Sequence, residues 1–219
     1  MKNFLPYNLN GNRLLLTANR TIFWEDKETL VLSDLHLGKS GHFRKAGIGV
    51  PQSVFKEDMQ RLLSEIQIYN AKQLIIVGDL FHSRENKEHE MFLRWRNDLP
   101  GVNIHLVLGN HDILKKEWYL GAGIELHENV LKLKNLLFTH DINNCNHLED
   151  NSYCISGHIH PGISLHGLGR QSLRFPCFYF GKKYAVLPAF GRFTGTFPVK
   201  PVSGDAVFAL VENKIMQLQ

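Results

Sequence analysis

The chain has 219 residues, a formal net charge of +4 and a hydrophobic content of 43%. This length suits one large domain with a substantial core, and the mild basic excess is compatible with an anionic substrate without requiring one. No stretch approaches the roughly 18 consecutive apolar residues that a membrane span needs. We therefore exclude a membrane protein and expect a single domain over residues 1–219, located in the cytoplasm.

The first half of the chain alternates apolar runs with amphipathic segments. The apolar runs that end in polar residues are LVLSD at 30–34, LIIVGD at 74–79, IHLVLGNHD at 104–112, LLFTHD at 136–141 and YCISGHIH at 153–160. Between the first two, apolar residues recur at helical spacing over residues 54–69, after a helix-starting Pro51. A second helix is expected over residues 88–98. The pattern predicts a β-α-β-α-β order.

The second half is richer in strand candidates. Besides the runs that end in histidines, apolar segments at 130–133, around Phe178, at 184–187 and at 206–211 favour strands. We therefore expect an α/β protein with two packed sheets flanked by helices.

The three cysteines are Cys145, Cys154 and Cys177, with no C-x-x-C pair. An odd number without that spacing argues against a disulfide framework and against a thiolate zinc site. We expect reduced thiols.

Polar residues that end several strands are expected to meet, because sites in layered α/β proteins lie beyond the carboxyl ends of the strands. Asp34 and His36 stand two positions apart, so in an extended chain they point to the same side and can hold one ion. Asp79 has two carboxylate oxygens and can bridge two cations. Neutral ligands are available from Asn110, His140, His158 and His160. These residues predict a two-metal site.

The charge of such a site suits phosphate chemistry. Two divalent ions and the two carboxylates of Asp34 and Asp79 leave a net charge of about +2, which attracts a phosphate. His111 follows Asn110 and is not needed as a ligand. It is therefore placed to stabilise the transition state or to protonate the leaving oxygen.

Each short pattern also has a structural explanation. A single D-x-H or H-x-H is common by chance, a buried histidine is more often a hydrogen-bonded core residue than a ligand, and Gly-Asp after a strand is usually a turn. The order of the patterns changes this balance. D-x-H, GD, GNHD, a strand-terminal histidine and GHxH, all at strand ends, form a joint pattern that coincidence rarely makes.

The motifs DLH at 34–36, GDLFH at 78–82, GNHD at 109–112, THD at 139–141 and GHIH at 157–160 resemble those of the calcineurin-like metallophosphoesterase superfamily. The resemblance implies a four-layer α-β-β-α sandwich of two mixed sheets flanked by helices, with His111 as the catalytic histidine. It implies one metal on Asp34, His36, Asp79 and His160, and a second on Asp79, Asn110, His140 and His158. The chain departs from the usual motif in that Asp141, rather than glycine, follows His140.

A closer resemblance covers most of the chain. The segments SDLHLGKSGHFRKAGIGVP, GDLFHS, FLRWR, GHIHPG and LPAFGRFTG resemble the bacterial ligase-associated DNA damage response endonuclease family. That resemblance implies a DNA endonuclease linked to repair, with a DNA ligase, a helicase and an exonuclease as partners. GDLFH also resembles the nuclease subunit of double-strand-break repair complexes, which implies that His82 assists phosphodiester cleavage. The alternative is a loop histidine that supports a ligand or faces solvent.

Basic side chains near the expected site are candidates for binding nucleic acid. His42 and Arg44 follow the first metal strand, and Arg192 lies in AFGRFTG, so each could contact a phosphate that flanks the scissile one. The alternative is a solvated basic loop. No nucleic-acid-binding module is visible in the sequence, so we expect strong DNA affinity to need a partner or a homodimer.

Three functions remain open. The first is the nucleic-acid phosphodiesterase, with two divalent ions, which we expect to be manganese, although nitrogen and oxygen ligands also accept iron, zinc or cobalt. The second is a small-molecule phosphoesterase such as a nucleotide-sugar-lipid pyrophosphatase, because SDLHLG also resembles lipid A precursor hydrolases, although those usually carry Arg where His111 stands. The third is a non-catalytic scaffold, against which the retention of every ligand type argues.

Overall fold

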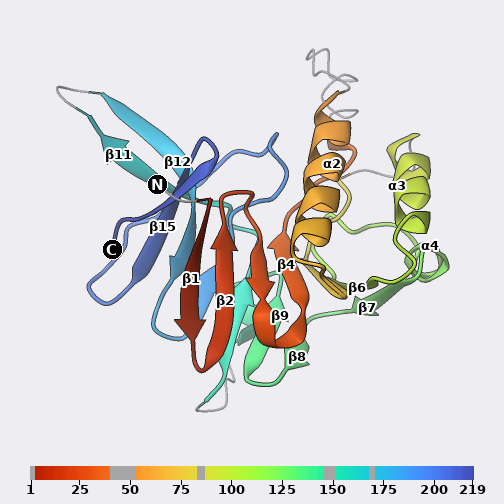
Figure 1. The fold of residues 1–219 in the computed structure, drawn as a ribbon, viewed down its shortest axis with the longest axis horizontal. Coiled ribbons are helices and arrows are strands. Elements are labelled where there is room, and N and C mark those ends of the chain that lie inside the picture. Colours follow the sequence, from red (N-terminus) through yellow and green to blue (C-terminus); the bar gives the residue numbers. More distant parts are fainter. Residues whose placement is uncertain (1–2, 40–52, 83–86, 146–150, 168–170) are drawn as a thin grey trace.

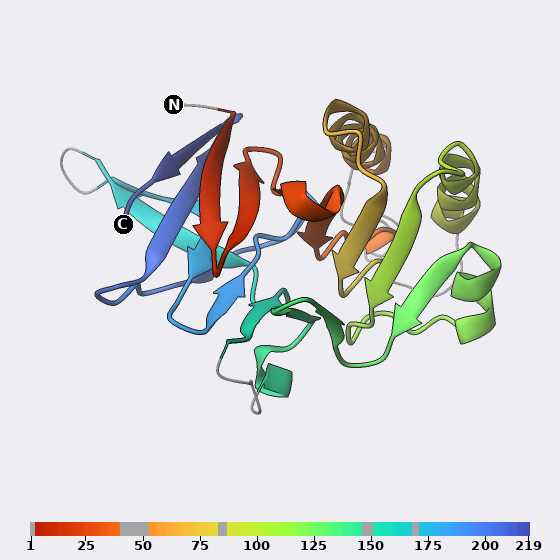
Figure 2. The ribbon, with the colours of Figure 1, turned by 60° about the horizontal axis from the view of Figure 1, so that its bottom comes forward.

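A computed structural model describes residues 3–39, 53–82, 87–145, 151–167 and 171–219. Its main feature is a pair of β-sheets that pack against each other (Figures 1 and 2). The helices gather at one end of the molecule, over the part of the first sheet that contains β4–β7, while both chain termini lie at the other, all-strand end.

The first sheet has seven strands in sequence order. They are β1 (Phe4–Leu9), β2 (Asn12–Thr17), β3 (Ile22–Trp24), β4 (Thr29–Ser33), β5 (Gln73–Val77), β6 (Asn103–Val107) and β7 (Ile124–His127). Neighbours from β1 to β4 are antiparallel, and neighbours from β4 to β7 are parallel. Strands β4, β5 and β6 were predicted from the sequence, whereas β1, β2, β3 and β7 were not.

The β1–β2 hairpin turns at Asn10 and Gly11, which both have positive φ, at 49° and 79°. Two positive φ angles in a two-residue loop are typical of a type I′ turn, for which Asn-Gly is the favoured pair. The dipeptide between two apolar runs was therefore a usable signal for this hairpin.

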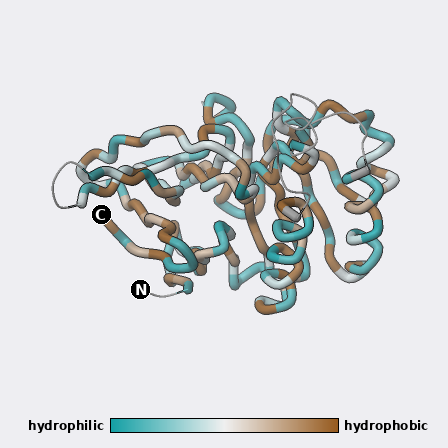
Figure 3. The backbone as a smooth tube through the Cα atoms, turned by 90° about the horizontal axis from the view of Figure 1, so that it is seen from above, coloured by the Kyte–Doolittle hydropathy of each residue, from teal (hydrophilic) through white to brown (hydrophobic). Residues whose placement is uncertain are grey.

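The described α-helices are α2 (Ser53–Ile68), α3 (Lys87–Asn97) and α4 (Lys116–Gly121), and two 3-10 turns are η1 (Glu25–Lys27) and η2 (Ile142–Cys145). Helix α2 buries Phe55, Met59, Leu62 and Ile66 in one core with β4 and β5, as its helical spacing predicted. The tube in Figure 3 alternates between hydrophilic and hydrophobic residues along the helices, as expected for elements with one buried face. No described helix is long and apolar enough to cross a membrane.

The second sheet has nine strands, most of them ordered β14-β11-β12-β13-β10-β9-β8, with β15 pairing β12 and β16. They are β8 (Leu131–Leu133), β9 (Leu136–Thr139), β10 (Tyr153–Ser156), β11 (Pro161–His166), β12 (Ser172–Phe180), β13 (Tyr184–Val186), β14 (Phe197–Pro198), β15 (Ala206–Val211) and β16 (Lys214–Gln217). Parallel pairs β9–β10 and β10–β13 place the carboxyl ends of these strands at one edge.

The two sheets share an apolar core. Val31, Val77 and Val107 of the first sheet lie in one cluster with Phe138 and Phe178 of the second. Alternate residues of the second sheet face away from this core and form a smaller cluster of Cys177, Tyr179, Val186 and Val207. The expected pair of packed mixed sheets is therefore confirmed.

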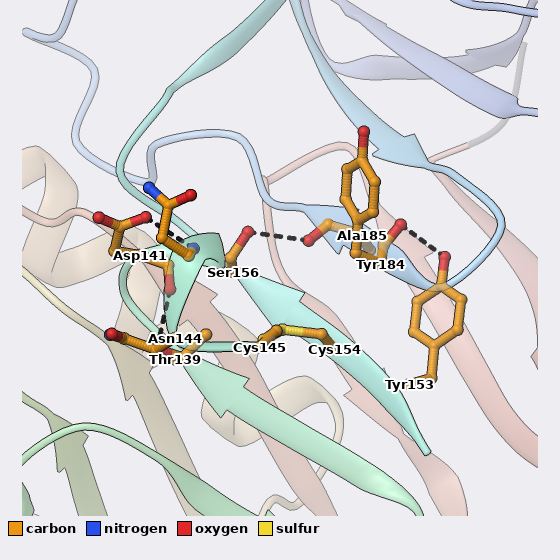
Figure 4. Close-up of a disulfide and its surroundings, with 10 residues drawn as sticks. Thr139, Asp141, Asn144, Cys145, Tyr153, Cys154, Ser156, Tyr184 and Ala185 are labelled. Carbon is orange, nitrogen blue, oxygen red and sulfur yellow. Dashed lines mark hydrogen bonds between the residues drawn. A yellow bond between two sulfur atoms is a disulfide. The ribbon is translucent and has the colours of Figure 1, made fainter. Parts of the chain in front are cut away.

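A disulfide joins Cys145 at the end of η2 to Cys154 in β10 (Figure 4). The expectation of reduced thiols is wrong for this pair, because the turn after β9 brings the chain back beside β10 and places the two Cα atoms 6.4 Å apart. Counting cysteines along the sequence does not reveal such proximity. Cys177 is free and fully buried.

Candidate metal centre

Loops from both sheets converge at the carboxyl ends of their parallel strands. Asp34, Asp79 and Asn110 follow β4, β5 and β6, whereas His140 and His158 follow β9 and β10. The described structure brings three-residue groups together around the two aspartates. These groups are Asp34, His36 and His160, and Asp34, Asp79 and His140.

Asp34 and His36 lie beyond the end of β4, and both have left-handed backbone, with φ of 52° and 49°. The extended geometry expected for this pair is therefore wrong. Leu35 between them is only 2% exposed and belongs to the helix-side core. The side chains of Asp34 and His36 nevertheless lie in one candidate metal-binding group, together with His160. Left-handed backbone at non-glycine residues costs about 1–3 kcal/mol and is concentrated at functional sites.

The same conformation recurs at other predicted ligands, namely Asp79, His158 and His160. Two glycines, Gly78 and Gly109, allow the backbone to lie very close to the side chains of predicted ligands. A Cβ at Gly109 would lie 2.2 Å from Oδ1 of Asp79, and one at Gly78 would lie 1.9 Å from Nδ1 of His140. Neither position accepts a side chain without displacing a predicted ligand.

The first group surrounds a point between Asp34, His36 and His160. Nε2 of His36 lies 3.2 Å from Nε2 of His160, which in turn lies 3.3 Å from Oδ1 of Asp34. Atoms that share one ion at metal–nitrogen distances of 2.0–2.1 Å lie roughly 2.9–3.4 Å apart. The spacing of these atoms therefore fits a bound cation.

The second group is centred on His140. Its Nε2 lies 3.0 Å from Oδ1 of Asn110 and 3.0 Å from Nδ1 of His158. His140 itself is 5% exposed. Although Asp141 departs from the usual motif, the imidazole of His140 points into the group of predicted ligands.

Asp79 lies between the two groups. Its Oδ2 is 3.7 Å from Nε2 of His36 and 3.5 Å from Nε2 of His140. Its Oδ1 accepts a hydrogen bond from the backbone N–H of His111 at 2.9 Å. One oxygen of the carboxylate thus faces both groups, and the other is held by the protein.

Burial shapes the charges of these residues. Burial opposes ionisation of Asp34, but the hydrogen bond from His160 and the charges of nearby histidines lower the pKa of Asp34 overall. Burial lowers the pKa of His36 to about 3, which leaves its ring neutral and able to act as a ligand. Burial also raises the pKa of Asp79, against the opposing effect of His140. Two buried carboxylates beside several imidazole nitrogens suit divalent cations.

Asp112, the last residue of GNHD, holds the neighbouring loops. Its Oδ1 accepts hydrogen bonds from the backbone N–H groups of Leu80 and Phe81, and its Oδ2 accepts one from Gly109. Burial raises the pKa of Asp112 to about 7. Asp112 therefore connects the loop after β5 to the loop after β6 and helps to fix the positions of the predicted ligands Asp79 and Asn110, which these loops carry.

The predicted catalytic histidines stand together beside the first group. The ring centroids of His82 and His111 lie 4.5 Å apart, and each lies 5.4 Å from the ring of His36. Both loops therefore present an imidazole to the same side of the site.

A hollow beside the site is lined by Lys39, Arg192, Phe193, Thr194 and Gly195. The side chain of Arg192 is exposed, and its backbone N–H donates to Oδ2 of Asp58.

Lys39 was not among the predicted site residues. Burial lowers its pKa, against the opposing charges of Asp79 and Asp34. A basic residue three positions after His36 was the available signal. Predicted substrate contacts His42 and Arg44 lie outside the described residues.

The segment that carries Arg192 is fixed by a buried ion pair. Arg61 of α2 bonds Oδ1 of Asp58 at 2.6 Å and donates to the carbonyl of Phe190 at 2.5 Å. The backbone N–H of Gly191 donates to the carbonyl of Asp34 at 3.1 Å. The segment that follows β13 is thereby held against the loop that carries the first predicted ligands.

Comparisons with known proteins agree with this geometry. The model of the calcineurin-like phosphoesterase family matches residues 28–191. The crystal structure of Pseudomonas putida nuclease MPE superimposes with a TM-score of 0.82 at 26% identity, and the match covers 99% of this chain and 100% of that one. A search of curated proteins finds no match. The chain therefore belongs to the calcineurin-like phosphoesterase family and is a metal-dependent hydrolase of phosphoric esters.

Proposed function

We propose that the protein is a dinuclear phosphodiesterase that cuts DNA as an endonuclease in DNA repair. The observation that carries the proposal is the position of Asp79 Oδ2, at 3.5–3.7 Å from a histidine of each ligand group. A carboxylate oxygen between two sets of ligands is suited to bridging two cations. The nuclease in the similar solved structure supports a nucleic-acid substrate.

The proposed ligand sets follow the two groups. Asp34, His36, Asp79 and His160 would hold one ion, and Asp79, Asn110, His140 and His158 would hold the other. Divalent ions at these positions, with manganese as the proposed native metal, would activate a water molecule and polarise the phosphoryl oxygens.

The protein's own groups supply the rest of the proposed chemistry. His111 would hold a proton for the leaving oxygen, and His82, whose ring lies 4.5 Å away, would orient the scissile phosphodiester. Lys39 and Arg192 line one hollow, so they would bind the phosphates that flank the scissile one.

The remaining parts of the proposal concern its surroundings. The proposed DNA substrate would be met in the cytoplasm, which is the proposed location, and a DNA ligase, a helicase and an exonuclease are candidate repair partners. A homodimer or one of these partners would extend the short basic rim around Arg192 along the DNA.

The test is cleavage of circular single-stranded and double-stranded DNA by metal-stripped protein reloaded with manganese, beside an aryl phosphodiester and the His111→Ala variant. We expect the wild type to cut circles and the variant to spare them. A wild type that cuts only the aryl phosphodiester would contradict the DNA endonuclease and favour a small-molecule phosphoesterase. Failure to hydrolyse either substrate would contradict the whole proposal.

A further inference from the structure

A second cluster of metal-ligand side chains lies at the outer edge of the first sheet, on β6 and β7. The two strands pair in parallel, with His105 beside Glu125 and Val107 beside His127. Val107 belongs to the core between the sheets, whereas Leu106 and Ile124 belong to the core under the helices. Because side chains alternate along a strand, His105, Glu125 and His127 all project from the face that turns away from the helices.

The three side chains converge on one point. Nδ1 of His105 lies 3.3 Å from Nε2 of His127 and 3.4 Å from Oε2 of Glu125, and Nε2 of His127 lies 3.5 Å from Oε1 of Glu125. Four ligands placed tetrahedrally at 2.0–2.1 Å from an ion are separated by roughly 3.3–3.4 Å. His105 faces Oε2 of Glu125 and His127 faces Oε1, so each observed separation is close to such an edge length, and one ligand atom from each of the three residues lies within 4.8 Å of the other two.

The surroundings of the cluster suit a bound ion that solvent can reach. The side chains of His105 and His127 are 15% and 16% exposed, and that of Glu125 is 65% exposed. Ile75 of β5 pairs beside His105 and provides an apolar neighbour on the inner side. Ordinary packing at the edge of this core would use apolar side chains, so two inward imidazoles that face one carboxylate call for a different explanation.

We propose that His105, Glu125 and His127 form a further metal site, distinct from the phosphoesterase centre, which takes one zinc-type divalent ion. Two imidazole nitrogens and one carboxylate oxygen are a known zinc donor set, and water from the open side would complete the tetrahedron. This donor set suits zinc, cobalt, nickel or copper better than magnesium or calcium, which prefer oxygen ligands.

The site would tie the edge strand β7 to the loop that carries predicted catalytic residues. The carbonyl of His127 accepts a hydrogen bond from the backbone N–H of Leu108 at 2.9 Å. Leu108 directly precedes the GNHD loop, which contains Asn110 and His111. An ion on His105 and His127 would therefore hold the start of this loop in place.

The test counts ions bound by the full chain. Wild type, His127→Gln and a control, His166→Gln, are dialysed to equilibrium against zinc and analysed by inductively coupled plasma mass spectrometry. His166 is exposed at the end of β11, so its variant controls for nonspecific binding by a surface histidine. We expect His127→Gln to bind one zinc ion fewer per chain than wild type and control, whatever number the phosphoesterase centre takes. Equal numbers in all three proteins would overturn the proposal.

Glu125→Gln provides a second route, because its exposed side chain tolerates substitution and the variant is expected to fold even if His127→Gln does not. It is expected to lose the same ion. Anomalous diffraction from zinc-loaded crystals then locates the metal. A peak between β6 and β7 would support the site, and occupied phosphoesterase positions without that peak would refute it.

Discussion

The backbone N–H of His111 donates a hydrogen bond to Oδ1 of Asp79 at 2.9 Å, while Oδ2 of the same carboxylate faces the two ligand groups. This hydrogen bond thus fixes the position of His111, the proposed acid, relative to Asp79, the proposed bridging ligand. Replacing either residue is expected to have a distinct effect.

Asp79→Asn is expected to reduce bound metal from two ions per chain to fewer than one. An amide oxygen can still accept the hydrogen bond from His111, but the NH₂ group would then point at both ion positions, where only an acceptor binds. Metal content after manganese loading checks this, with Asp98→Asn, at an exposed position directly after α3, as a charge-matched control. Two ions retained at full occupancy would contradict the bridging role.

His111→Ala is expected to keep its metal and to lose turnover by roughly 10²–10⁴-fold, because it removes a proton donor and no ligand. Metal content and the rate of phosphodiester hydrolysis check this.

His82→Ala distinguishes the role of His82 from that of His111. If His82 orients a diester, its variant loses phosphodiester cleavage and keeps hydrolysis of an aryl phosphomonoester. Parallel loss of both activities would instead indicate a general supporting role for His82.

Arg192→Ala is expected to weaken binding of single-stranded DNA while leaving turnover of an aryl phosphodiester almost unchanged. Arg192 lines the hollow with Lys39 and has an exposed side chain, so it can reach phosphates that a small substrate lacks. Fluorescence anisotropy at two salt concentrations checks this, and the salt dependence is expected to be less steep for the variant. Arg94→Ala on α3 is the control. Equal effects of Arg192→Ala on both substrates would exclude a role in flanking contacts.

Cys145→Ser is expected to lower the free energy of unfolding by about 2–3 kcal/mol, because it opens a short covalent loop in the unfolded chain. Urea unfolding checks this, and wild type treated with reductant should match the variant. An unchanged midpoint would mean that the bond between Cys145 and Cys154 is not formed in solution. Disulfides are rare in the cytosol, so thiol trapping directly from cells also tests the proposed location.

Cys177 is expected to resist alkylation in the folded protein. Burial raises its pKa to about 12, so at pH 8 the side chain is a protonated thiol, whereas the thiolate is the reactive form. Mass spectrometry after iodoacetamide treatment should find this residue unmodified under native conditions and modified in urea. Rapid modification of the folded protein would contradict its burial in β12.

Much of the candidate site was predictable because its ligands have a positional signature. Asp34, Asp79 and His140 each follow a buried strand, and parallel strands bring such residues to one edge whatever the details of packing. The local backbone was not predictable, since Asp34 and His36 adopt a left-handed conformation on either side of the buried Leu35, where the sequence predicts an extended chain. The pattern of residue types therefore predicted which side chains lie close together beyond the strand ends, but not the backbone conformation that brings them there.

Long-range contacts explain most of what the sequence concealed. Ala189, which follows β13, forms an isolated β-bridge with Ser33 of β4, and a disulfide joins Cys145 to Cys154. Neither contact leaves a trace in the periodicity of the chain. Strand β7 has only four residues, and β14 only two, so neither is long enough to establish a repeat.

The ligand groups draw on both sheets, with Asp34, Asp79 and Asn110 from the first and His140 and His158 from the second. Ions held between them would cross-link the two sheets, because the sheets could not move relative to each other without breaking metal–ligand bonds. Folding and metal uptake would then be thermodynamically linked, and each tenfold rise in free metal above the dissociation constant would add about 1.4 kcal/mol per ion to the stability of the sandwich.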